Sequence, residues 1–78
     1  MVKIMFLGPF GRYMPSEDKD GYWVIDVAGQ SITDIVETTE IVNAKMNYFA
    51  LINDVRTDKN YILKDGDELN ILPLFFAG

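Results

Sequence analysis

The chain has 78 residues, of which 49% are hydrophobic and 24% charged, and its formal net charge is -5 at pH 7. This length allows one domain, and the composition is typical of a folded chain. The acidic balance, with scattered basic residues, argues against nucleic-acid binding. The absence of cysteine and histidine removes a thiol nucleophile, a disulfide, and the commonest general base and metal ligand.

The first third of the chain predicts a β-hairpin with a long loop. Period-two alternation over residues 2–7 predicts a strand with its even-numbered residues on one face. Residues 8–11 lack the spacing and the lysine of a phosphate loop, and we interpret them as a turn. Residues 12–21 are polar and predict a mobile connection to a second strand over residues 22–27.

A short amphipathic helix is predicted next. Ser31 and Asp34 have the spacing of a capping box, and the helix is expected to end near residues 40–41. Its buried face follows the i, i+3, i+4, i+7 rule and comprises Ile32, Ile35, Val36 and Thr39. A solvated acidic face, open to basic residues of a partner, comprises Asp34, Glu37 and Glu40.

The second half predicts three strands. They cover residues 48–52, residues 55–56 after a tight turn at residues 53–54, and residues 68–74 after a turn at residues 64–67. The resulting order is β, β, α, β, short β, β. This order predicts an α+β domain in which one helix packs across one sheet.

Two groups of side chains have more than one interpretation. Asp65, Asp67 and Glu68 are metal-ligand residue types, but carboxylates in a turn are more typical of a solvated loop, so we expect no metal site. The second group is apolar and forms a patch on the open face of the sheet if alternation turns it outward; the alternative is that half of it belongs to the core. This group comprises Phe6, Tyr48, Leu51 and Leu74.

The C-terminus is the most informative segment, because an apolar run over residues 72–77 leads to Gly78. Chain ends are usually polar and frayed, so this pattern indicates an end that enters a partner. Pro73 cannot donate a hydrogen bond to a sheet, so strand pairing is expected to stop near it. The alternative is that Gly78 only marks where the chain stops.

These features resemble the ubiquitin-like β-grasp sulfur carriers of the MoaD/ThiS family over nearly the whole chain. The most specific matching segments are Leu51-Ile52-Asn53-Asp54 and Leu63-Lys64-Asp65-Gly66-Asp67-Glu68. Pro73, near the end of the last strand, is closer to the molybdopterin-synthase type than to the thiamine type. Family members usually end in Gly-Gly, whereas this chain ends in Ala77-Gly78.

The resemblance implies one β-grasp domain over residues 1–78, with a main helix across a mixed sheet of about four to five strands and residues 73–78 as a flexible tail. It implies a carrier rather than an enzyme. A ubiquitin-activating-type enzyme would use ATP to adenylate the Gly78 carboxylate, which is then converted to a thiocarboxylate. The large subunit of molybdopterin synthase, or a similar acceptor, would take the sulfur for the molybdenum or tungsten cofactor. The carrier itself is expected to bind no cofactor.

The resemblance also implies which residues bind the partner, namely Pro73, Leu74, Phe75, Phe76 and Ala77. At least one of the two phenylalanines is expected to anchor in a pocket of the partner, as aromatic residues often do at interfaces. Burial in the domain's own core is the alternative for both.

Three other functions stay open at this stage. The chain is a ubiquitin-like binding module or a small accessory subunit whose tail docks without activation, a sulfur carrier of the thiamine pathway, or a regulatory subunit of a metal or redox enzyme that uses the sheet face alone.

The longest apolar run is too short to span a bilayer, and the N-terminus does not resemble a signal peptide. We therefore expect a cytoplasmic protein without membrane partners.

Overall fold

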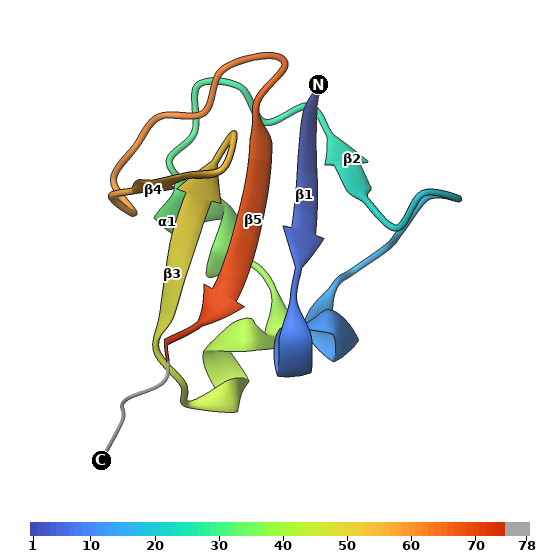
Figure 1. Ribbon diagram of the computed structural model, residues 1–78, viewed down its shortest axis with the longest axis vertical. Coiled ribbons are helices and arrows are strands. Elements are labelled where there is room, and N and C mark those ends of the chain that lie inside the picture. Colours follow the sequence, from blue (N-terminus) through green and yellow to red (C-terminus); the bar gives the residue numbers. More distant parts are fainter. Residues whose placement is uncertain (75–78) are drawn as a thin grey trace.

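The computed structural model describes residues 1–74, which build a five-stranded mixed sheet and three short helices (Figure 1). The strands are β1 (Val2–Phe6), β2 (Trp23–Ile25), β3 (Tyr48–Ile52), β4 (Val55–Thr57) and β5 (Glu68–Pro73). The α-helix is α1 (Ile32–Val36), and the two 3₁₀ helices are η1 (Gly8–Tyr13) and η2 (Glu40–Ala44). The predicted α+β class is confirmed, and the arrangement is compatible with a β-grasp.

The strands lie in the order β2-β1-β5-β3-β4. β1 and β5 are parallel, and the other neighbouring pairs are antiparallel. The first two strands form the predicted hairpin, although β2 is shorter than expected. β5, the last strand within residues 1–74, is third in this order and is therefore the central strand of the sheet.

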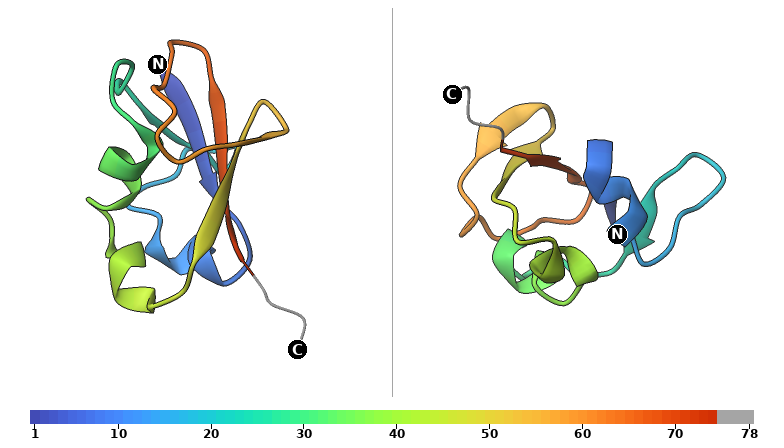
Figure 2. Two further views of the ribbon diagram at one scale, coloured as in Figure 1. Left: turned by 90° about the vertical axis from the view of Figure 1, so that its left-hand side faces the viewer. Right: turned by 90° about the horizontal axis from the view of Figure 1, so that it is seen from below.

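One face of the sheet carries the core. Figure 2 shows α1 and η2 on the same side of the sheet. The predicted alternation is confirmed, since the side chains that point to this side are buried: Val2, Ile4 and Phe6 from β1, Ala50 and Ile52 from β3, and Leu69 and Ile71 from β5. The predicted inner face of the helical segment is also buried, namely Ile32, Ile35, Val36 and Thr39.

The predicted helix begins where expected but ends early, at Val36. The Ser31 hydroxyl caps it by accepting a hydrogen bond from Asp34 N at 3.1 Å. The prediction of an end near residues 40–41 is wrong because two threonine hydroxyls turn back on the chain: Thr38 Oγ1 and Thr39 Oγ1 each donate to the carbonyl three residues earlier, at 2.6 Å. Such side-chain bonds compete with helix continuation.

The interpretation of residues 8–11 as a turn is also incomplete. They belong to η1, which packs against β1 and β5 and places Phe10 in the core, fully buried. Pro9 suits the first turn of such a helix because its φ is already near the helical value. Further along this connection, Asp18 accepts hydrogen bonds from Asp20 N at 2.9 Å and Tyr22 N at 3.0 Å, which orders the turn before β2.

No helix within residues 1–74 is long and apolar enough to cross a bilayer.

Phe10 tests whether η1 is part of the core. Phe10→Ala is expected to cost about 3–5 kcal/mol, close to the whole stability of a small domain, because it removes a buried ring. Phe10→Leu should fold and lose about 1 kcal/mol. Val55→Ala is the control, since Val55 is 66% exposed and its loss should cost at most about 0.5 kcal/mol. Urea unfolding at equilibrium measures all three, and similar midpoints for Phe10→Ala and Val55→Ala would contradict this account.

Candidate functional site

The structure describes only the first two residues of the predicted reactive tail, Pro73 and Leu74, which we call the tail root. Phe75, Phe76, Ala77 and Gly78 lie outside the described residues. Pro73 is the last residue of β5, opposite Tyr48 of β3, and its side chain is buried. Leu74 is half-buried, and its N–H donates to Asn47 O at 2.9 Å. Strand pairing therefore stops close to Pro73, as predicted, with one further hydrogen bond from Leu74, and Pro73 itself belongs to the sheet rather than to a flexible tail.

The other side of the root is braced by the start of η1. Leu7 N donates to Ile71 O at 2.9 Å, which extends the β1–β5 ladder beyond Phe6. Gly8 then turns the chain with φ at +59°, and a Cβ at this position would lie 3.8 Å from Pro73 Cγ. Glycine adopts positive φ at the least cost, so Gly8 suits this turn, and a Cβ here would make only an ordinary van der Waals contact with Pro73. The end of β5 is thus held by hydrogen bonds on both sides, from Leu7 and to Asn47.

A groove of about 630 Å³ opens beside this root, and we call it the exit groove. It is assembled from α1, the adjacent ends of β3 and β4, the loop after β4, and the root itself. Its lining residues are Thr33, Tyr48, Phe49, Arg56, Thr57, Asp58, Lys59, Asn60 and Leu74.

Two cations of the exit groove lie over aromatic rings. Lys59 Nζ is 4.0 Å from the centroid of the Tyr48 ring, and Arg56 Cζ is 4.8 Å from the centroid of the Phe49 ring. Both distances are within the range of cation–π attraction. Burial raises the pKa of the Tyr48 phenol, so Tyr48 is a neutral platform beneath the ammonium at neutral pH. The sequence pattern did not indicate this groove.

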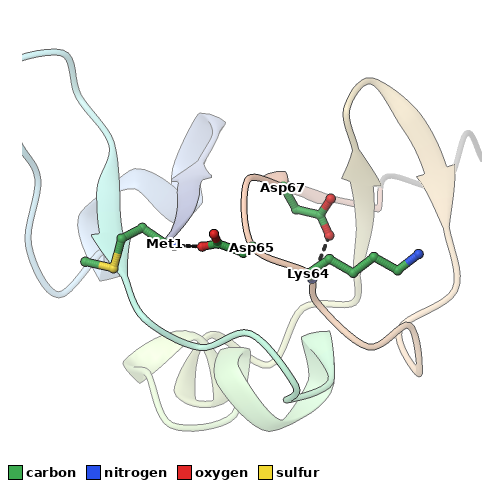
Figure 3. Close-up of polar contacts among 4 residues, drawn as sticks. All are labelled: Met1, Lys64, Asp65 and Asp67. Carbon is green, nitrogen blue, oxygen red and sulfur yellow. Dashed lines mark hydrogen bonds and ion pairs between the residues drawn. The ribbon is translucent and has the colours of Figure 1, made fainter.

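The turn at residues 64–67 makes polar contacts with several segments of the fold, and Figure 3 shows some of them. Asp67 Oδ2 accepts hydrogen bonds from Lys64 N and from the Tyr61 hydroxyl, both at 2.9 Å, and Asp67 Oδ1 lies 3.4 Å from Asn53 Nδ2. Asp65 is exposed and pairs with the amino group of Met1. The expectation of a solvated turn is therefore wrong for Asp67, which is buried.

Two of the three acidic residues of this turn make contacts within the domain. Among residues 1–74, no group of three or more acidic side chains is placed to hold an ion together. Asp67 instead accepts hydrogen bonds from its own domain, and Asp65 points to the N-terminus.

The predicted apolar patch divides between two faces. Phe6 lies in the core and Tyr48 packs against it, whereas Leu51 and Leu74 are half-buried outside the core. The arrangement is closer to the alternative in which half of this group belongs to the core, with Phe6 inside the core and Tyr48 at its edge. The predicted acidic face of the helical segment is exposed, as expected.

The turn motif and the tail root lie at opposite ends of β5 (Figure 1). The turn motif and the end of β5, two of the sequence features that carry the resemblance, are therefore separate in space. The chain matches no protein-family model, and no curated protein is detectably similar to it.

The role of Asp67 can be tested by removing its carboxylate. Asp67→Ala leaves Lys64 N–H and the Tyr61 hydroxyl without their acceptor and is expected to cost about 1–3 kcal/mol. Asp65→Ala is the matched control, because it removes an acid from the same turn whose ion pair is exposed and contributes about 0–1 kcal/mol. Urea midpoints at neutral pH compare the two. An equal loss of stability in the two variants would show that the hydrogen bonds of Asp67 contribute no more to folding than an exposed ion pair does.

The Asp67 contact also predicts a pH effect at Tyr61. The hydrogen bond to the Asp67 carboxylate raises the pKa of the Tyr61 phenol. The protonated phenol therefore stabilises the fold fully below the phenol's unfolded pKa of about 10, and this contribution is lost as the pH rises through the higher folded pKa. Ultraviolet titration of the phenolates should show that Tyr61→Phe removes a late-titrating tyrosine and that Asp67→Asn moves one to lower pH. A titration unchanged in both variants would contradict the contact.

Proposed function

We propose that this chain is a β-grasp sulfur carrier of the MoaD/ThiS type, acting as a substrate and subunit rather than as an enzyme. The observation that supports this most is the course of β5, the central strand, which ends at Pro73, five residues before Gly78, at a point held by hydrogen bonds on both sides. A carrier needs a rigid body and a reactive end that reaches another protein's active site. Delivery to molybdopterin, or to its tungsten form, is the preferred destination because of Pro73.

The proposed chemistry takes place at the Gly78 carboxylate, which must be the free end of the chain. One of its oxygens attacks the α-phosphorus of ATP held by a ubiquitin-activating-type enzyme, and pyrophosphate leaves. A donor that supplies sulfur at the oxidation level of sulfide (HS⁻) then attacks the acyl carbon, AMP leaves and the sulfur loses its proton, so that a thiocarboxylate replaces the carboxylate. The large subunit of molybdopterin synthase, or a similar acceptor, consumes this sulfur.

The residues at the end of the chain suit this role. An extended chain spans about 3.3 Å per residue, so Gly78 can reach about 13 Å beyond Leu74. Gly78 has no side chain to obstruct a narrow channel and no Cβ to restrict its backbone. The carrier would supply a positioned reactive group, and the partner would supply the catalysis.

Docking without activation is the second candidate, and Ala77 favours it. Family members usually carry glycine here, and a channel fitted to two glycines has no room for a methyl group. In this case the chain is a ubiquitin-like binding module or an accessory subunit that uses the same tail root. A sulfur carrier of the thiamine pathway would share the tail chemistry but differ in the acceptor.

Mass spectrometry distinguishes these candidates. The intact mass first establishes that the chain ends at Gly78. The chain is then incubated with a ubiquitin-activating-type enzyme, ATP and a sulfur donor. We expect the mass to increase by the difference between sulfur and oxygen, with the change on the C-terminal peptide. A variant that lacks Gly78 is the control and should show no increase.

Ala77→Gly completes this experiment. If the chain is a carrier, the wild type is modified and Ala77→Gly is modified at least as fast. If neither is modified although both bind the enzyme through the tail, the carrier proposal is wrong and docking is favoured. Modification of Ala77→Gly alone would show that the methyl group prevents activation of the natural chain.

A further inference from the structure

We propose that the exit groove binds an extended acidic segment of the protein that receives the tail, with carboxylates of that segment pairing with Arg56 and Lys59. This inference rests on the proposed function, because the tail is what brings a partner to this end of the sheet. It adds a second contact, made by residues outside the tail, and it specifies the chemistry of the partner's surface.

The charge of the exit groove is opposite to that of the chain. The net charge is -5, yet two of the seven basic residues line the groove together with a single acid, Asp58. Asp58 Oδ1 already accepts a hydrogen bond from Asn60 N at 2.8 Å. An acidic protein with a local basic surface favours an acidic counterpart at that point and repels it elsewhere, which orients the encounter.

The ammonium of Lys59 is held in place before any partner arrives. Lys59 O accepts hydrogen bonds from Thr33 N and Thr33 Oγ1, both at 3.1 Å, which fixes the loop against the start of α1. Its Nζ lies over the Tyr48 ring. A side chain that is already positioned loses less conformational freedom on binding.

The guanidinium of Arg56 is positioned in a similar way and keeps its donors for a ligand. Arg56 pairs with Leu51 in the β3–β4 ladder, and its guanidinium lies over the ring of Phe49. Within residues 1–74, the one ion pair joins Met1 and Asp65, so neither Arg56 nor Lys59 is neutralised by a carboxylate of the described part of the chain.

The shape and walls of the groove favour a peptide segment over a small anion. Its volume of about 630 Å³ exceeds that of a single carboxylate or phosphate group. Phe49 and Leu74 add apolar walls beside the cations. β4 is an edge strand, and extended segments commonly bind along such edges. A segment that alternates acidic and apolar side chains would satisfy both kinds of wall.

The test uses a short capped peptide of alternating glutamate and leucine as the probe, titrated into the isotope-labelled full chain and followed by amide chemical shifts. The matched peptide has glutamine in place of glutamate. We expect the glutamate peptide to shift the amides of groove residues, including Thr33, Phe49 and Thr57, and to bind at least about tenfold more tightly than the glutamine peptide.

Charge-matched variants locate the contact. Arg56→Gln with Lys59→Gln should weaken binding of the glutamate peptide by at least about tenfold, whereas Lys19→Gln with Lys64→Gln, which removes the same charge from exposed positions elsewhere, should weaken it far less. Lys59→Gln alone provides the measurement if the double variant does not fold. Equal losses in the two pairs, equal binding of the glutamine peptide, or the same shifts with inorganic phosphate would overturn the proposal, the last by showing a small-anion site.

The proposal for the exit groove and the proposed function of the tail can be contradicted independently. If the wild type is not converted to a thiocarboxylate, the proposed function is wrong, but the peptide titration still decides whether the groove binds acidic segments. If conversion occurs, the Arg56 and Lys59 double variant should need a several-fold higher concentration for half-maximal rate than the Lys19 and Lys64 control. Equal concentrations would show that the enzyme that activates the tail does not use the groove.

Discussion

The parallel pairing of β1 with β5 is the constraint on which the rest of the structure depends. It joins the first strand of the chain to the last, in register from Lys3 opposite Glu68 to Phe6 opposite Ile71. Closing a loop of this length is entropically costly, so the pairing requires the apolar contacts that the two strands make together. Every other element then has a fixed place: β2 and β3 flank the central pair, and the helices cover the face that carries the core.

Polar contacts secure this pairing at one end, and packing secures it at the other. At the turn before β5, Lys3 N donates to Asp67 O at 3.1 Å while the Asp67 side chain holds the turn itself. At the far end, η1 packs against β1 and β5 and buries Phe10. A domain of this size has little apolar surface to bury, so a satisfied polar network is a considerable part of what fixes its geometry.

Local patterns predicted most of the fold. Contacts distant in sequence account for most of what they missed, and competing local hydrogen bonds account for the end of the helix. Strand alternation, the Ser31 cap and the turn at residues 53–54 depend on neighbouring residues, and all three are confirmed. The helix end was wrong because the two threonine hydroxyls bond to the backbone of their own turn. The burial of Phe10 and Asp67 depends on distant partners, and an acid beside glycine in a turn is usually solvated. The exit groove, assembled from four distant segments, has no linear signature.

The direction of β5 has a mechanical consequence. Because β1 and β5 are parallel, a force that draws the end of β5 away from the start of β1 acts along both strands and in opposite directions. The hydrogen bonds between them are then loaded together, in shear, rather than opened one after another. If the start of β1 is held and the end of β5 is pulled, all the hydrogen bonds between the two strands resist together. The domain would then unfold in a single step or remain intact.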